Sequence, residues 1–217
     1  MMHLEILPPP QRAFWEKDAP SLPGGWALYG GTAIALHLGH RQSLDFDFFS
    51  AAPLDRRELR RRCPLLAEAK TLQDEPETLT VVAERAGEPL KLSFFGGITF
   101  GRVGEPIRVA GRPAIASRLD LLGTKLATVT QRIEPRDYLD IAALLASGLT
   151  INDGVAALLA LYGSQASGLQ SVKTIAWFKD GSLDTVLPAE VKERLLLAAA
   201  QYDPRTSPAP KVSQRLD

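Results

Sequence analysis

The sequence has little cysteine and no long apolar run. Its single cysteine, Cys63, excludes an internal disulfide bond, fits a reducing compartment and has no partner at metal-ligand spacing, so we interpret it as a packing residue. No apolar stretch approaches 18 residues, and the N-terminus, MMHLEILPPP, lacks the pattern of a secretion signal. These absences predict a cytoplasmic protein with no membrane partner.

The sequence also lacks net charge, since 25 basic and 25 acidic residues balance. A neutral chain has no general field that attracts nucleic acid, so any RNA contact must come from a local patch. The densest basic run, residues 56–62, is either a solvated helix face or a contact for phosphates. No Walker loop, Gly-x-Ser-x-Gly elbow or zinc pattern is present, which argues against the enzyme classes that depend on them.

What the sequence does contain is an unusual stretch at residues 26–49, WALYGGTAIALHLGHRQSLDFDFF. It predicts a strand, a Gly-Gly turn, a short helix and a second strand. Gly30 and Gly31 allow backbone angles that a side chain would forbid, and Thr32 is expected to cap the helix. The start of a helix favours an anion, so we interpret Gly30, Gly31 and Thr32 as a phosphate-binding turn.

The second predicted strand, residues 44–49, alternates strictly between apolar and polar positions. Asp45 and Asp47 therefore share one face of the sheet. Two carboxylates at such positions repel each other unless a cation or donor lies between them. Oxygen ligands suit Mg²⁺ (or Mn²⁺), which is usually shared with substrate phosphates, so we predict a metal site at these aspartates. An isolated Asp-x-Asp pattern can also be a solvated strand edge.

With the glycine turn and the aspartates together, GGTAIALHLGHRQSLDFDFF resembles the first motif of the polymerase β-like nucleotidyltransferase fold, in the form found in the AbiEii/AbiGii toxin family. This family belongs to bacterial abortive-infection and toxin–antitoxin systems. A second stretch, DLLGTKLATVTQRIEPRDYLDIAALL, looks like the family's second motif, in which a lysine and an arginine precede Arg-Asp-x-x-Asp. The resemblance spans residues 25–146.

The resemblance implies an α+β (α/β) fold, with a mixed sheet followed by a helical C-terminal part. Alternating runs at residues 66–72, 79–84 and 90–95 bring the predicted sheet to about five strands, and residues 107–113 form a last extended piece. We divide the chain into a nucleotidyltransferase core at residues 1–112, a helical region at 113–203 that completes the site, and a disordered tail at 204–217, which is polar and rich in proline.

The strand at residues 90–95 departs from the wider fold. Active members of that fold often carry a third carboxylate on such a strand, whereas this sequence has Ser93 there, with Lys91 facing the same way. We keep Ser93 as a candidate nucleotide-binding residue. The missing acid also leaves open a different class of function, a nucleotide-binding module that has lost catalysis.

The helical part begins with a predicted capping box at Ser117 and Asp120, and its first helix is expected at residues 118–133. Its core-facing stripe consists of Leu119, Leu122, Leu126, Val129 and Ile133. Arg118, Lys125 and Arg132, spaced seven apart, border this stripe. They are either side chains that reach for water or a row directed at a triphosphate or nucleic acid.

The next helix begins at Pro135 and carries Asp137 on its inner face, where the carboxylate needs a partner. An ion pair with a nearby lysine or arginine is the structural explanation. The resemblance implies a functional one: Lys125 neutralises phosphate charge, and Asp137 orients Lys125 or helps to activate the acceptor, with Asp140 as an alternative alignment. The further candidates for phosphate contact are Arg41, Arg132 and Arg136.

The activity that the resemblance implies is transfer of a nucleoside monophosphate from a nucleoside triphosphate (NTP) such as ATP to an acceptor hydroxyl, with Mg²⁺ and release of pyrophosphate. Characterised relatives suggest RNA as the acceptor, especially the 3′ end of tRNA, and a toxin that is neutralised by a partner antitoxin. A small-molecule acceptor, as in enzymes that modify aminoglycosides, remains an alternative.

Overall fold

The computed structural model describes residues 2–217, and its centre is a six-stranded mixed sheet in the order β3-β4-β5-β2-β1-β6. The strands are β1 (Ala27–Tyr29), β2 (Asp45–Phe49), β3 (Lys70–Glu75), β4 (Thr78–Arg85), β5 (Glu88–Phe95) and β6 (Ala114–Ile115). β2 pairs in parallel with β5 and antiparallel with β1. The predicted α+β class is confirmed. The two-residue β6 is the additional strand, and it is too short to give a sequence pattern.

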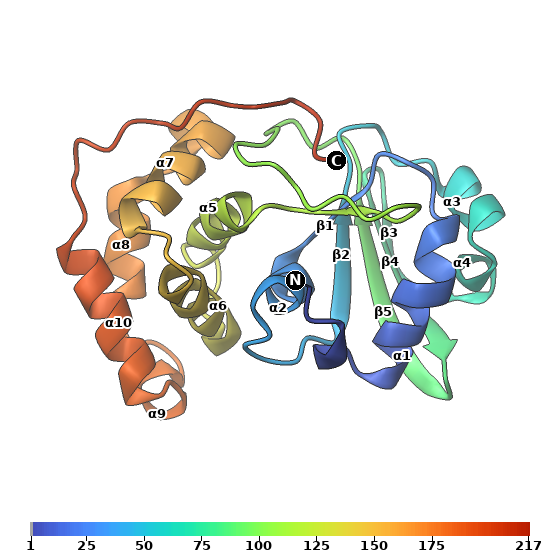
Figure 1. The fold of residues 1–217 in the computed structure, drawn as a ribbon, viewed down its shortest axis with the longest axis horizontal. Coiled ribbons are helices and arrows are strands. Elements are labelled where there is room, and N and C mark those ends of the chain that lie inside the picture. The colour runs from blue at the N-terminus through green and yellow to red at the C-terminus, as the bar shows by residue number, and fades with distance from the viewer. Residues whose placement is uncertain (1) are drawn as a thin grey trace.

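Helices cover both faces of this sheet. They are η1 (Leu4–Ile6), α1 (Pro9–Ala13), η2 (Phe14–Asp18), η3 (Ala19–Ser21), α2 (Gly30–Leu38), α3 (Arg56–Arg62), α4 (Pro64–Glu68), α5 (Arg118–Thr128), α6 (Pro135–Ala146), α7 (Ile151–Tyr162), η4 (Gly163–Gln165), α8 (Gly168–Ile175), α9 (Leu183–Val186) and α10 (Ala189–Ala200). Figure 1 shows α1, α3 and α4 on one side of the sheet and α2 on the other, with α5 and α6 beyond α2.

The alternation in β2 decides which side chains face which layer. Phe46 and Phe48 are fully buried, and Phe14 packs on both, with ring centroids 5.0 and 6.1 Å away. Because neighbouring positions on a strand point to opposite faces, Asp45 and Asp47 lie on the other face. The aromatic packing of one face therefore fixes the two carboxylates on the other.

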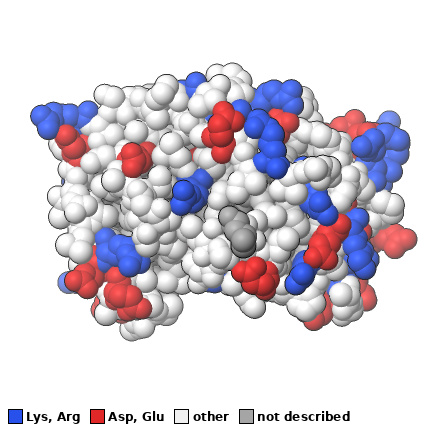
Figure 2. Space-filling model, viewed as in Figure 1, with Lys and Arg blue, Asp and Glu red and all other residues white. Residues whose placement is uncertain are grey.

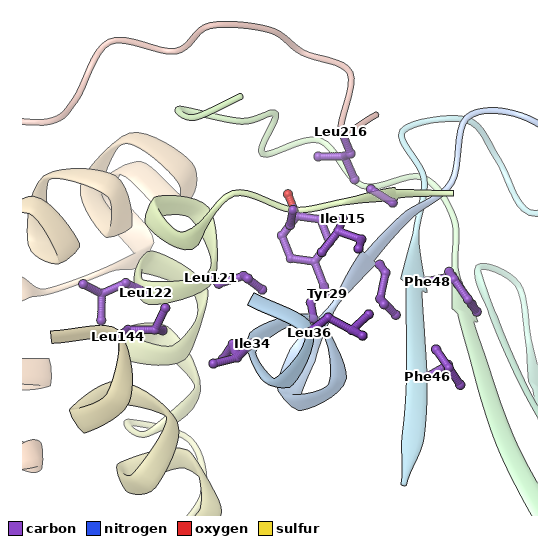
Figure 3. Close-up of a cluster of buried hydrophobic side chains, with 14 of the residues drawn as sticks. Tyr29, Ile34, Leu36, Phe46, Phe48, Ile115, Leu121, Leu122, Leu144 and Leu216 are labelled. Atoms are coloured by element: carbon purple, nitrogen blue, oxygen red, sulfur yellow. The ribbon is translucent and has the colours of Figure 1, made fainter. Parts of the chain in front are cut away.

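One hydrophobic core joins the sheet to the helices that follow it. Figure 3 shows Ile34 of α2 directed toward Leu121, Leu122 and Leu144 of α5 and α6, and Leu36 of α2 directed toward the sheet. All five side chains are buried. Since this core continues across residue 112, the division of the chain at that point stays a prediction.

Helix α5 ends earlier than the sequence predicts. Ser117 caps its N-terminus as expected, by accepting a hydrogen bond from the backbone N–H of Asp120. The helix stops at Thr128, and Ile133, the last member of the predicted stripe, is 49% exposed. Residues 129–131 instead form a turn and residues 132–134 a short loop, which brings Arg132 to the start of α6.

The predicted strand at residues 66–72 is also corrected. Its first half belongs to α4, which begins at Pro64, a residue well suited to the first turn of a helix. The strand starts only at Lys70, where β3 pairs with β4. Leu66 faces the core from the helix rather than from the sheet.

The C-terminal segment is extended and contacts the rest of the chain near its end, while the disorder expected for residues 204–217 stays a prediction. Figure 1 shows it leaving α10, passing over α7 and returning to the sheet. Arg102 exchanges backbone hydrogen bonds with Val212 and Ser213, and Leu216 is 1% exposed. These contacts hold part of a segment whose polar, proline-rich composition predicts disorder.

Two surface properties bear on partners. Among residues 2–217, no single helix has the length and apolarity to cross a membrane; Pro135–Ala146 and Ile151–Gln165 pass that test only as a pair, bent by 117°. On the face shown in Figure 2, basic and acidic side chains are interspersed. That face therefore offers local patches rather than a broad field of one sign.

The docked tail leads to a first prediction. Leu216→Ala should lower the free energy of unfolding by about 2 kcal/mol, because it removes a buried leucine and leaves a cavity. Urea denaturation followed by circular dichroism measures this change. Val212→Ala is the matched control, since Val212 is 52% exposed and should change stability by less than about 0.5 kcal/mol. Equal midpoints for Leu216→Ala and the parent would show that the tail does not pack in solution.

Candidate active site

The site begins with the pairing of β2 and β5. Their parallel register places Lys91 opposite Asp45 and Ser93 opposite Asp47. The Nζ atom of Lys91 lies 3.6 Å from a carboxylate oxygen of Asp45. Ser93 is buried, and its hydroxyl lowers the pKa of Asp47, which favours the ionised carboxylate. Ser93, a predicted nucleotide-binding residue, therefore supports Asp47 from within the sheet and does not line the cavity.

The ionised form of Asp47 is destabilised by its surroundings. Burial raises its pKa, and the nearby charge of Asp45 raises it further; Lys91, Lys125 and Ser93 offset only part of this rise. A divalent cation would relieve both the desolvation and the repulsion, so the aspartate pair fits the predicted metal. Within residues 2–217, no group of three or more histidine, cysteine or acidic side chains is arranged to hold a metal. Substrate oxygens and water would have to supply the remaining ligands.

The glycine turn lies directly against these carboxylates. Gly30 has a φ of +70°, and a Cβ atom there would lie 2.6 Å from a carboxylate oxygen of Asp47. A Cβ atom on Gly31 would lie 2.5 Å from a guanidinium nitrogen of Arg41. Gly30 therefore allows a left-handed backbone beside β2, and Gly31 leaves room for the guanidinium group of Arg41.

Thr32 does not have the predicted role. Helix α2 begins at Gly30 with Tyr29 as its N-cap, so Thr32 is inside the helix rather than at its end. Its side chain is buried, and its hydroxyl donates a hydrogen bond to the backbone carbonyl oxygen of Asp45. Thr32 thus fixes α2 to β2; the predicted capping role is wrong, and the predicted phosphate contact stays a prediction.

Lys125 extends from α5 into a pair of carboxylates on α6. Its Nζ atom lies 2.5 Å from Asp137 Oδ1 and 2.7 Å from Asp140 Oδ2. Arg132 donates hydrogen bonds to both oxygens of Asp137. Burial alone would raise the pKa of Asp137, but the hydrogen bonds from Arg132 and the charge of Lys125 outweigh burial and lower it. Asp137 is therefore an ionised anchor for two cations.

Asp140 is the second anchor. It is fully buried and accepts hydrogen bonds from His40 at 2.8 Å and from two nitrogens of Arg41 at 2.7 and 2.8 Å. Burial alone would raise the pKa of Asp140, but these hydrogen bonds and the charge of Lys125 hold it well below its ordinary value. The sequence left Asp137 and Asp140 as alternatives, and the structure places both in contact with Lys125.

Two neighbouring cavities open beside this network. The polar cavity has a volume of about 210 Å³, and the predicted residues that line it are Gly31, Arg41, Asp45, Asp47, Lys125, Arg132, Arg136 and Asp137. Lys91, Ser43 and Glu134 also line it. The second cavity measures about 230 Å³ and includes Gly30 in its wall. Asp47, Lys125 and Arg132 line both cavities, so the two form one continuous site.

The second cavity has an aromatic wall that the sequence analysis does not predict. It is lined by Tyr29, Phe49, Phe95 and Tyr162. Tyr29 stacks on Phe49 with ring centroids 4.8 Å apart. Burial raises the pKa of Tyr162 to about 12, which keeps its phenol neutral. Tyr162 comes from α7, far along the chain, and no sequence spacing connects it to β2.

The predicted row of three cations divides in the structure. Lys125 and Arg132 enter the site, whereas Arg118 donates to the backbone carbonyl of Ser147 and lines neither cavity. Arg136 lines the rim of the polar cavity and is 65% exposed, with Glu134 3.8 Å away. Arg118 and Lys125 both belong to α5, two turns apart, whereas Arg132 lies beyond the end of that helix.

Two aspartates on one strand, beside a glycine turn and a cluster of anchored cations, define the site of a nucleotidyltransferase fold. The chain belongs to the AbiEii family: the family description "Nucleotidyl transferase AbiEii toxin, Type IV TA system" matches residues 14–210. The resemblance seen in residues 25–146 is thereby confirmed, and it extends toward both ends of the chain.

Solved structures share the fold. A candidate nucleotidyltransferase from H. pylori matches with a TM-score of 0.55 and 18% identity, over 84% of this chain and 88% of that one. JHP933 from Helicobacter pylori matches with a TM-score of 0.54 and 18% identity, over 84% of this chain and 85% of that one. MenT4, a nucleotidyltransferase toxin from Mycobacterium tuberculosis H37Rv, matches with a TM-score of 0.50 and 14% identity, over 82% of this chain and 76% of that one. No functionally curated protein matches.

The raised pKa of Asp47 predicts that Asp47→Asn stabilises the metal-free protein at neutral pH. Because the folded pKa lies above the unfolded value of about 3.9, the folded state loses stability as pH rises through this interval. The introduced amide cannot ionise, so the variant avoids this loss of stability. A gain of about 1 kcal/mol in the free energy of unfolding raises the melting temperature by about 2–4 °C in a chain of this size. Differential scanning fluorimetry with a chelator tests this.

The control for this measurement is Asp45→Asn, because the Asp45 side chain is 40% exposed and should respond less. As pH falls toward the unfolded pKa value of about 3.9, the melting temperatures of the parent and Asp47→Asn should approach each other, because the stability lost through the raised pKa is recovered there. A melting temperature of Asp47→Asn at or below that of the parent at neutral pH contradicts the electrostatic account.

Asp140→Ala should lower the free energy of unfolding by about 3–5 kcal/mol, because it leaves Arg41 without its buried partner and removes one of the two carboxylates that hold Lys125. Urea denaturation gives this value. The matched control is Glu134→Ala on the cavity rim, where the side chain is 44% exposed and the loss should stay below about 1 kcal/mol. Similar losses for both variants would place Asp140 outside the network.

Proposed function

We propose that the chain binds a nucleoside triphosphate together with a divalent cation, Mg²⁺ or Mn²⁺, and transfers the nucleoside monophosphate to an acceptor hydroxyl, releasing pyrophosphate. The observation that carries this proposal is the polar cavity, in which two carboxylates of β2 face cations that are already held in place. Membership of the AbiEii family supports the reaction class.

Asp45 and Asp47 are the residues that would hold the cation, because their shared face, and the burial and mutual repulsion that raise the pKa of Asp47, suit a hard positive ion. When bound, such an ion supplies neutralisation of phosphate charge and stabilisation of the leaving pyrophosphate. Ser93, opposite Asp47 on the next strand, favours the ionised form of that carboxylate.

Arg41, Lys125 and Arg132 would bind the phosphates beyond the transferred group. Three cations held by two carboxylates, Asp137 and Asp140, leave a net charge of 3 − 2 = +1 in the network. Because ion pairs fix these groups before the substrate arrives, little reorganisation is needed when phosphate charge develops. The glycine turn would let the phosphates approach the backbone closely.

The sequence left two roles open for Asp137, to orient Lys125 or to help activate the acceptor, and we assign it the first. Both of its carboxylate oxygens already accept hydrogen bonds from cations. Its lowered pKa also makes it a weak base, which disfavours proton abstraction from the acceptor. We therefore assign to Asp137 the positioning of Lys125 and Arg132.

The acceptor is proposed to be RNA, with the 3′ end of tRNA as the preferred candidate, and the protein to act in the cytoplasm as the toxin of a toxin–antitoxin pair. The aromatic wall of the second cavity supports a nucleotide acceptor or donor, since Phe49, Phe95 and Tyr162 can pack against a base. A catalytically inactive nucleotide-binding module is the second candidate, and Ser93 in place of a third acid favours it.

The transfer reaction gives the next prediction. The parent, incubated with Mg²⁺, total tRNA and each labelled nucleoside triphosphate in turn, should place label on RNA, and Asp45→Ala should lower the rate at least about a hundredfold. Asp74→Ala, on the edge strand β3, is the matched control and should retain the parent rate. Gel separation of the labelled RNA gives the measurement.

Other outcomes of the same assay decide between the candidates. Label on an added aminoglycoside instead of RNA would support the small-molecule alternative, and triphosphate binding without transfer would support the inactive module. Growth arrest on expression that Asp45→Ala abolishes would connect the activity to toxicity.

A further inference from the structure

One tryptophan differs from the other two. Trp15 and Trp26 are buried, whereas Trp177 is 51% exposed. Trp177 lies in the loop after α8, beside an open hollow of about 510 Å³ that Lys173, Thr174, Ala176 and Asp180 also line. A large aromatic side chain that stays in water beside a hollow is a frequent mark of a binding surface.

The charges around this ring are mainly positive. The Nζ atom of Lys179 lies 5.8 Å from the centre of the Trp177 ring. Lys173 lines the same hollow, and both lysines are exposed. Asp180 contributes one opposing charge. An exposed aromatic face bordered by two lysines matches what single-stranded nucleic acid requires: a stacking platform for a base and cations for its phosphates.

The loop that carries Trp177 packs against the start of α6. Phe178 contacts Tyr138 with ring centroids 6.4 Å apart, and the hydroxyl of Tyr138 donates to the carbonyl oxygen of Thr174. Tyr138 directly follows Asp137, which lines the polar cavity. The hollow and the cavity are therefore connected through one turn of helix.

A second contact joins the same two regions. Gly181 lies beside Ile133, since a Cβ atom on this glycine would be 3.4 Å from the Ile133 side chain. Ile133 is 49% exposed and follows Arg132 of the polar cavity. Arg136, which is 65% exposed, also lines the polar cavity. The chain thus presents positive and apolar groups from the site outward.

We propose that the surface formed by Trp177, Lys173 and Lys179 binds single-stranded nucleotides of an RNA acceptor whose end enters the polar cavity. This inference rests on the proposed function and adds where the acceptor lies outside the catalytic groups. A protein partner fits less well, because lysine is depleted at protein–protein interfaces. Stacking on Trp177 would be tolerant of sequence, since every base has a flat face.

Binding is measured by fluorescence anisotropy with a labelled single-stranded oligoadenylate, and transfer by label on total tRNA. Trp177→Ala should weaken oligoadenylate binding at least about fivefold and raise KM for RNA, while kcat and KM for the triphosphate stay at parent values. Trp177→Phe should restore most of the binding. Replacing Lys173 and Lys179 with alanine should reduce the salt dependence of log K by about 0.7 for each lysine.

Matched controls are Leu196→Ala, an exposed apolar side chain on α10, and Lys70→Ala on β3. Neither should alter binding or KM for RNA. Parent-like binding and KM in Trp177→Ala overturn the proposal. So does self-association of the parent that Trp177→Ala abolishes, because the tryptophan would then serve a protein interface.

The two proposals fail in different ways. A parent that transfers no label to any acceptor refutes the proposed function, yet the anisotropy measurement still shows whether Trp177 binds single-stranded RNA. Transfer that depends on Asp45 but not on Trp177 refutes the acceptor surface alone.

Discussion

The ion pairs of Lys125 with Asp137 and Asp140 are the interaction on which the rest of the site depends. They connect α5 to α6, and Asp140 adds His40 and Arg41 from the loop before the metal strand. Buried charges are costly unless they are paired, so this network is stable only when all of its members are in place. The loop, the two helices and the glycine turn are thereby held in one arrangement before any substrate binds.

Strand β2, which carries Asp45 and Asp47, differs from this network because its charges are not fully paired. On β2, Asp45 pairs with Lys91, whereas burial and the charge of Asp45 raise the pKa of Asp47 despite Lys91 and Lys125. The fold accepts this cost because Phe46 and Phe48 on the other face fix the strand in the core. The packing of the aromatic face thus holds Asp45 and Asp47 together on the other face, although their negative charge is only partly balanced. Functional sites often contain such destabilising groups.

Sequence analysis could predict the parts of this site that depend on local spacing. Strict alternation places Asp45 and Asp47 on one face, and helical spacing turns Asp137 inward. It could not predict that Arg41 pairs with Asp140, because 99 positions separate them. Thr32 shows the complementary error: its position after two glycines indicates a cap, but a tertiary hydrogen bond to Asp45 decides its role. Tail packing through Leu216 likewise depends on contacts that composition does not describe.

The charge balance of the polar cavity explains how a neutral chain can receive a polyanion. Its lining holds five cations, Arg41, Lys91, Lys125, Arg132 and Arg136, and four acids, Asp45, Asp47, Glu134 and Asp137. With Asp140 behind Lys125 the total is 5 − 5 = 0. A triphosphate alone therefore gains little from this cavity, whereas a divalent cation at the aspartates makes the site positive. Each ligand then favours binding of the other, because linkage between two sites is reciprocal.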